Sequence, residues 1–129
     1  MNISQAAGIA ALPAKTLRYY EDIGLVVPAR RENGYRDYAQ EDLTRLRLIG
    51  RARKLGFSIE ECRTLLALQA DRHRASADVK RIAQAHLKEI DEKIAELQAL
   101  RSDFAPLVAA CKGDEGADCA ILKDLVQPH

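Results

Sequence analysis

The sequence has no tryptophan, two phenylalanines and four tyrosines among its 129 residues. Its core must therefore be built mainly from Leu, Ile, Val and Ala, as in helical proteins. Its three cysteines, an odd number, argue against a disulfide framework and favour cytosolic thiol chemistry. The chain also lacks a secretory signal and a run of the ~20 apolar residues that a membrane span needs. These absences predict a cytoplasmic protein with no membrane partner.

Net charge is small, at +1, but it is unevenly distributed along the chain. Residues 1–75 hold thirteen Lys and Arg against nine Asp and Glu, whereas residues 76–129 hold seven against ten. A basic N-terminal part is a weak indication of nucleic-acid binding. With 47% hydrophobic and 30% charged residues, the chain is expected to be soluble and able to bury a core.

The first 23 residues predict two short helices with a tight connection. Ser4 is expected to cap the first helix, and Pro13 suits the first position of the second, where its missing N–H costs nothing. Leu17 and Tyr20 would then face inward. The outward positions of the second helix are Lys15, Arg18 and Tyr19. Two short helices with a basic second one suggest a helix-turn-helix, with an ordinary helical hairpin as the alternative.

A basic hairpin is predicted next in the chain. Asn33-Gly34 is a favoured hairpin centre because both residues tolerate positive φ. Arginines lie before this turn and just after it, with Tyr35 between them; they are Arg30, Arg31 and Arg36. Beside a helix-turn-helix, such a hairpin would act as a wing that holds the phosphate backbone, and a merely solvated hairpin is the alternative.

Two further helices follow the hairpin. The first is predicted over residues 40–55, with Leu43, Leu46 and Ile49 facing the core and Gly56 ending it. Its basic residues lie largely on the outer side: Arg45, Arg47, Arg51, Arg53 and Lys54. Ser58 and Glu61 form a capping box that opens the next helix, and residues 71–75 form a polar break.

A long helix is predicted from a cap at Ser76 to about Ala110. Its apolar positions alternate by four and three, with the polar Lys93 falling on the stripe between the fourth and the fifth: Val79, Ala83, His86, Ile90, Leu97, Leu100, Phe104 and Leu107. This 3.5-residue period over roughly four heptads indicates a coiled-coil dimer seam. Packing of the helix against its own chain is the alternative.

Cys111 and Cys119 bracket a seven-residue loop near the C-terminus. Zinc, cadmium and lead usually need three or four protein ligands, whereas Cu(I), Ag(I) and Au(I) accept two sulfurs in a linear arrangement. No third Cys or His lies nearby in the sequence, because His129 is terminal. The pair therefore points to a monovalent ion, with two unrelated surface thiols as the alternative. Cys62, within a helix, is expected to be a buried or idle cysteine.

Residues 17–25, Leu-Arg-Tyr-Tyr-Glu-Asp-Ile-Gly-Leu, resemble the "IRYYExxGL" segment of the MerR family of transcription regulators. Residues 33–38 are similar to the family's wing, and residues 53–58 to the end of its following helix. The resemblance covers nearly the whole chain. Within the family, residues 75–80 and the loop from Cys111 to Cys119 are similar to the CueR-type copper-efflux regulators.

The resemblance implies a mostly α fold in three parts. These are a winged helix-turn-helix DNA-binding domain (1–75), a long antiparallel coiled-coil dimerisation helix (76–110), and a metal-binding loop with a short helix (111–129). The residues expected to contact DNA are Lys15, Arg18, Tyr19, Tyr20, Arg31, Tyr35, Arg36 and Arg53. Cys111 and Cys119 are the expected metal ligands, and Ser76 and Lys80 the expected selectivity residues.

The resemblance also implies a mechanism. A homodimer would sit on a promoter whose spacer is too long for RNA polymerase, and metal binding would distort the DNA. Divalent-ion sensors of the family carry a Cys where this chain has Ser76, so copper, silver or gold is expected. A zinc, cadmium or lead sensor and a copper chaperone or storage protein remain alternatives. An enzyme is not expected, because no Cys–His motif or glycine-rich phosphate cradle is present.

Overall fold

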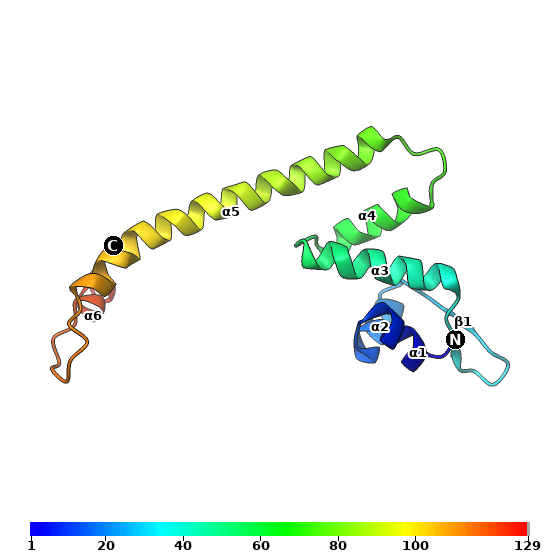
Figure 1. Ribbon diagram of the computed structural model, residues 1–129, viewed down its shortest axis with the longest axis horizontal. Helices are drawn as coiled ribbons and strands as arrows, with labels where there is room; N and C mark the ends of the chain where they lie inside the picture. The colour runs from blue at the N-terminus through cyan, green and yellow to red at the C-terminus, as the bar shows by residue number, and fades with distance from the viewer. Residues whose placement is uncertain (129) are drawn as a thin grey trace. The chain divides into compact units, whose positions relative to one another are not determined.

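The computed structural model describes residues 1–128, and His129 lies outside the described residues. The predicted mostly α fold is confirmed, with two strands forming a small hairpin (Figure 1). The elements in chain order are α1 (Ile3–Ala10), α2 (Ala14–Asp22), β1 (Ala29–Arg30), β2 (Arg36–Asp37), α3 (Gln40–Lys54), α4 (Ile59–Ala70), α5 (Ser76–Ala110) and α6 (Ala120–Leu125).

The chain forms two compact units, one from Met1 to Lys80 and one from Arg81 onward. The boundary falls inside α5, a few residues beyond the predicted division at residues 75 and 76. The first unit contains α1 to α4 and the hairpin. The second contains most of α5, the cysteine loop and α6.

The predicted cap of α1 is wrong by two residues. Asn2, not Ser4, is the N-cap: its side chain accepts a hydrogen bond from the Gln5 N–H at 2.8 Å, and the Gln5 side chain accepts one from the Asn2 N–H at 3.0 Å. This reciprocal pair satisfies two free donors at the helix start, and Ser4 lies inside the first turn. Pro13 is the N-cap of α2, one position earlier than predicted.

The turn between α1 and α2 passes through a strained residue. Ala11, the C-cap of α1, has φ 55° and ψ 41°, and its N–H donates to the Ala7 carbonyl. This left-handed conformation costs an L-residue about 1–2 kcal/mol. It reverses the chain in few residues, so that α1 and α2 pack together.

The core of the first unit lies where α3 packs against α1 and α4. Leu43, Leu46 and Ile49 are buried, which confirms the inward face predicted from their spacing. Burying each such side chain stabilises the fold by about 1.5–3 kcal/mol. Other fully buried side chains are Leu17, Val26, Tyr38 and Cys62.

The junction between α3 and α4 also follows the prediction. Gly56 takes φ 90° just after α3, a conformation that glycine adopts at little cost. The Ser58 and Glu61 capping box is confirmed: the Ser58 N–H donates to the Glu61 carboxylate at 2.8 Å, and the Glu61 N–H to the Ser58 hydroxyl at 3.1 Å. The predicted polar break at residues 71–75 is present between α4 and α5.

Helix α5 has 35 residues, about 52 Å at 1.5 Å per residue. It ends at Ala110 as predicted, but Ser76 is its first helical residue and not its cap. Ala75 precedes the helix, and its carbonyl accepts a hydrogen bond from the Asp78 N–H at 3.1 Å. Within residues 1–128, none of the helices has the length and apolar character that crossing a membrane requires.

Candidate nucleic-acid interface and metal centre

The outer face of α2 carries three of the residues expected to contact DNA. Lys15, Arg18 and Tyr19 are spaced so that they share one side of the helix, and all three are exposed. Lys15 and Arg18 form no ion pair with any residue of the described chain, so both charges remain available to an anion.

Tyr20 was expected both to face inward and to contact DNA, and the structure places it in the core. Its side chain is 5% exposed, and burial raises the pKa of its hydroxyl. Its ring centroid lies 6.0 Å from that of Tyr19, with the rings tilted by 46°. Tyr20 therefore packs in the core beneath the outer face of α2 and offers little surface to DNA.

The wing hairpin is present, but its predicted turn geometry is wrong. The Arg31 N–H donates to the Tyr35 carbonyl and the Gly34 N–H to the Arg31 carbonyl, both at 2.8 Å. Of the expected pair, only Gly34 takes positive φ, at 85°. The Asn33 side chain instead accepts a hydrogen bond from the Tyr35 N–H at 3.1 Å. Such a bond to the backbone two residues on is typical of Asn in turns, and the result is a three-residue loop closed by glycine.

Glu21, in the last turn of α2, pairs with an arginine on each strand of the wing. Its carboxylate accepts Arg30 Nη2 at 2.6 Å and Arg36 Nε at 3.1 Å. The Glu21 side chain is 13% exposed and that of Arg36 is 24% exposed. Arg36 was expected to contact DNA, but its guanidinium is directed to α2.

Arg31 and Tyr35 lie on the outer side of the wing. Tyr35 is 71% exposed. Arg31 is paired with Asp37 at 3.6 Å, and both side chains are about half exposed. A long, solvated pair of this kind exchanges readily for another anion. Arg31 is therefore the wing arginine best placed to reach a phosphate.

Arg53 lies in the last turn of α3 and is exposed. Its Nη1 donates to the Phe57 carbonyl at 2.8 Å, which steadies the bend between α3 and α4. Arg63, on α4, was not singled out from the sequence, yet its Nη2 donates to the Ile23 carbonyl at 3.0 Å just after α2. No local pattern marks this contact, because the two residues are 40 positions apart in the chain.

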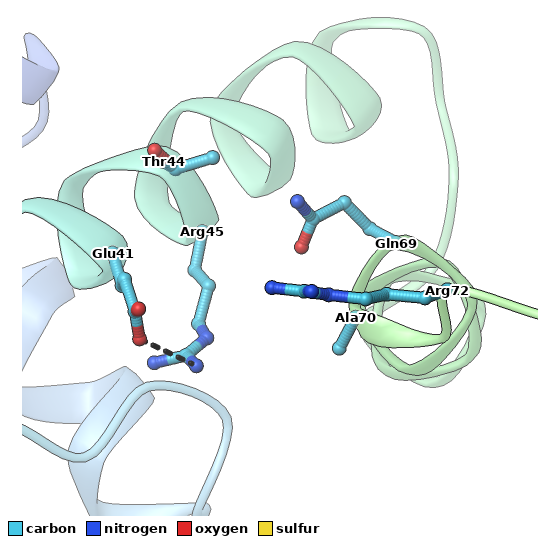
Figure 2. Close-up of a pocket in the computed structure, with 6 residues that line it drawn as sticks. All are labelled: Glu41, Thr44, Arg45, Gln69, Ala70 and Arg72. Atoms are coloured by element: carbon cyan, nitrogen blue, oxygen red, sulfur yellow. Dashed lines mark ion pairs between the residues drawn. The ribbon is translucent and has the colours of Figure 1, made fainter.

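A hollow of about 390 Å³ lies between the start of α3 and the end of α4. Figure 2 shows Arg45 and Arg72 reaching into it from opposite sides. Arg45 is already paired with Asp42 at 3.1 Å and with Glu41 at 3.8 Å. The hollow therefore does not add a cluster of free cations to the α2 and wing surface.

The structure brings the two predicted metal ligands together. Cys111 follows the last residue of α5 and Cys119 precedes the first residue of α6. Their Sγ atoms are 3.7 Å apart, and both side chains are half-buried. A disulfide bond would be about 2.05 Å, so these are free thiols facing each other.

Hydrogen bonding distinguishes the two thiols. The Leu122 N–H and, to a smaller extent, the Cys111 thiol lower the pKa of Cys119. The thiolate is the form that binds metal, so Cys119 is prepared for that role. Among residues 1–128, neither cysteine belongs to a group of three or more converging His, Cys, Asp or Glu side chains. The chain alone therefore supplies a two-sulfur site.

The loop between the cysteines has its own internal contacts. Gly113 takes φ 64°, and the Asp114 carboxylate accepts the Gly116 N–H at 2.9 Å. Asp118 pairs with Lys123 on α6 at 2.5 Å. Ser76 and Lys80, the expected selectivity residues, lie in the first two turns of α5 and are exposed.

Comparison with known proteins places this arrangement in a family. Residues 1–69 match the family described as "MerR HTH family regulatory protein" and residues 43–106 match "MerR, DNA binding". The chain is 58% identical to the HTH-type transcriptional regulator HmrR of Rhizobium leguminosarum bv. viciae, over 97% of each chain. It is 47% identical to the HTH-type transcriptional regulator CueR of Escherichia coli O6:H1, over 97% of this chain and 93% of that protein.

A solved structure of similar form is the transcription regulator PbrR691 from Ralstonia metallidurans CH34 in complex with lead(II). Its TM-score is 0.84 at 32% identity, and the match covers 97% of this chain and 98% of that one. The fold class and the regulator interpretation are thereby confirmed. The chain belongs to the MerR family of helix-turn-helix, DNA-binding transcription regulators.

Proposed function

We propose that this protein is a metal-responsive activator that binds promoter DNA as a homodimer and distorts it when Cys111 and Cys119 hold a monovalent soft metal ion. Cu(I) is the first candidate, and Ag(I) and Au(I) share its chemistry. The controlled genes would serve copper efflux or resistance. The observation that carries the proposal is the pair of free thiols 3.7 Å apart in a two-sulfur site.

The donor set fits a monovalent ion better than a divalent one. Soft thiolates suit Cu(I), whereas zinc-like ions take three or four ligands. Two thiolates around a +1 ion carry a net charge of −1. In a homodimer, the start of α5 from the second copy could offset this charge through the positive helix end at Ser76 and through Lys80. The name CueR among close relatives supports copper.

A divalent sensor of zinc, cadmium or lead is the second candidate. It is favoured by the likeness to PbrR691, which was solved with lead(II). In this chain, Ser76 stands where divalent-ion sensors of the family carry a thiolate, so a third sulfur would have to come from elsewhere. Cys62 is unsuited, because it is fully buried in α4 and burial raises the pKa of its thiol.

Homodimer formation is supported by the apolar side chains along α5. Ile94, Leu97, Leu100 and Phe104 are each about half or more exposed. Leu97, Leu100 and Phe104, together with Leu125 of α6, line a mostly apolar hollow of about 510 Å³. A second copy of α5 packed antiparallel would cover these side chains, as the 3.5-residue period predicts.

DNA binding is proposed through the outer face of α2 and the wing. Lys15, Arg18 and Tyr19 would enter the groove, and Arg31, Tyr35 and Arg53 would contact the backbone. RNA polymerase is the proposed partner once the DNA is distorted. Since promoter DNA lies in the bacterial cytoplasm, the protein would act there.

The test uses a duplex that the wild-type protein selects from a randomised pool, placed in a promoter for run-off transcription. Buffered Cu(I) should raise transcription with the wild type but not with the Cys111→Ser, Cys119→Ser double variant. Both proteins should bind the duplex. An equal response of the two proteins would reject the metal site, and a wild type without sequence-specific binding would favour a copper chaperone.

A further inference from the structure

The Glu21 carboxylate joins three elements of the first unit. It lies in the last turn of α2 and accepts hydrogen bonds from Arg30 on β1 and Arg36 on β2. Arg30 also donates through Nη1 to the Gly34 carbonyl at the tip of the hairpin, at 3.1 Å. One acidic side chain thus reaches both strands and, through Arg30, the turn between them.

We infer that Glu21 is a positioning residue of the DNA interface, which holds the wing in register with α2 so that the wing meets the DNA backbone when α2 enters the groove. The inference rests on the proposed DNA-binding function. Glu21 itself is not expected to touch DNA. It acts through Arg30 and Arg36, which are committed to the carboxylate and leave the exposed Arg31 for a phosphate.

The wing needs such an attachment because it has little structure of its own. Each of its strands has two residues, and an isolated two-stranded hairpin is at best marginally stable in water. The carboxylate is 13% exposed, so its charge-assisted hydrogen bonds are less screened than those of a surface pair. They are therefore suited to fixing the direction in which the wing points.

Loss of the Glu21 charge has two opposite effects on DNA binding. It removes a negative charge from a surface that meets phosphates, which strengthens binding to any DNA. It also removes the attachment of the wing to α2, which weakens only the sequence-specific complex, in which α2 and the wing must both be in contact with DNA. The ratio of affinities for selected and scrambled DNA separates these effects, whereas a single affinity does not.

The experiment compares Glu21→Gln with Asp22→Asn in the full-length protein. Asp22 is the next residue of α2, is exposed, and forms no ion pair with the described residues, so its variant removes the same charge without touching the wing. Affinities are measured for the selected duplex and for a scrambled duplex of equal composition. Glu21→Gln should lower the ratio about tenfold, as loss of one well-placed contact does, while Asp22→Asn leaves it unchanged. Equal ratios for the two variants would overturn the inference.

A double-mutant cycle tests whether Glu21 acts through Arg36. If it does, Glu21→Gln combined with Arg36→Gln should lower the ratio no further than the more damaging single change. If the double variant instead lowers the ratio by the product of the two single effects, the two residues act independently and the inference is overturned. If Glu21→Gln does not fold, Glu21→Asp replaces it, because it keeps the charge but shortens the reach to the two arginines. An unchanged ratio of affinities for selected and scrambled DNA in Glu21→Asp would also overturn the inference. A wild type that selects no duplex rejects the proposed function itself, and the inference with it.

Discussion

Replacement of Arg31 by alanine tests the assignment of the wing as a phosphate contact. The guanidinium is exposed, and among residues 1–128 it pairs only with Asp37, at the long distance of 3.6 Å. Because that pair is solvated, its loss should leave the fold intact. Any change in DNA affinity can then be assigned to the missing cation.

The size of the effect follows from counterion release. Each phosphate neutralised contributes about 0.9 to the slope of log K against log salt, and a homodimer loses one contact per half-site, so the slope should fall by about 1.8. If wild type and variant converge at 1 M salt, this slope corresponds to an affinity difference of about 60-fold at 0.1 M.

The assay is fluorescence anisotropy with the selected duplex between 0.1 and 0.5 M salt. Lys88→Ala is the matched control, since Lys88 is exposed on α5 in the second unit and lies outside the proposed interface. It should keep the wild-type slope. An Arg31→Ala slope equal to that of Lys88→Ala would refute the assignment of the wing.

Three further predictions concern other parts of the chain. Ser76→Cys should raise affinity for Zn(II) relative to Cu(I) in a competition titration, because it adds a third thiolate at the dimer site; unchanged selectivity would contradict the role of Ser76. Ala11→Gly should stabilise the protein by about 1 kcal/mol in urea denaturation, because relief of the left-handed strain at φ 55° outweighs the added freedom of the unfolded chain; a loss of stability would show that the turn is not strained. Under native alkylation followed by peptide mass spectrometry, Cys119 should react first and Cys62 last, since hydrogen bonds lower the pKa of Cys119 while burial raises that of Cys62; earlier modification of Cys62 would contradict its burial.

Features that depend on nearby residues were predictable from the sequence. The capping box of Ser58 and Glu61 has a fixed spacing, and the apolar period of α3 placed Leu43, Leu46 and Ile49 in the core. The hairpin was predicted correctly from Asn-Gly, but the prediction that both residues take positive φ was wrong. The hydrogen bond from the Tyr35 N–H to the Asn33 side chain accompanies a different turn.

Contacts between distant residues were not predictable in the same way. Glu21 meets arginines 9 and 15 positions further along the chain, and only the fold brings them together. For this reason Arg36 was assigned to DNA when its charge is directed to α2. The proximity of Cys111 and Cys119 likewise depends on how the loop returns from the end of α5 to α6, although their spacing suggested it.

We propose above that the two-thiol site selects a monovalent ion. This selectivity can be measured by titrating the fully reduced protein with Cu(I), Ag(I), Au(I) and Zn(II), each against a competing chelator of known affinity. We expect tight binding of one monovalent ion per site, abolished in the Cys111→Ser, Cys119→Ser double variant, and weak binding of Zn(II). Tight Zn(II) binding with weak Cu(I) binding would contradict the proposal and leave a divalent sensor of the same family.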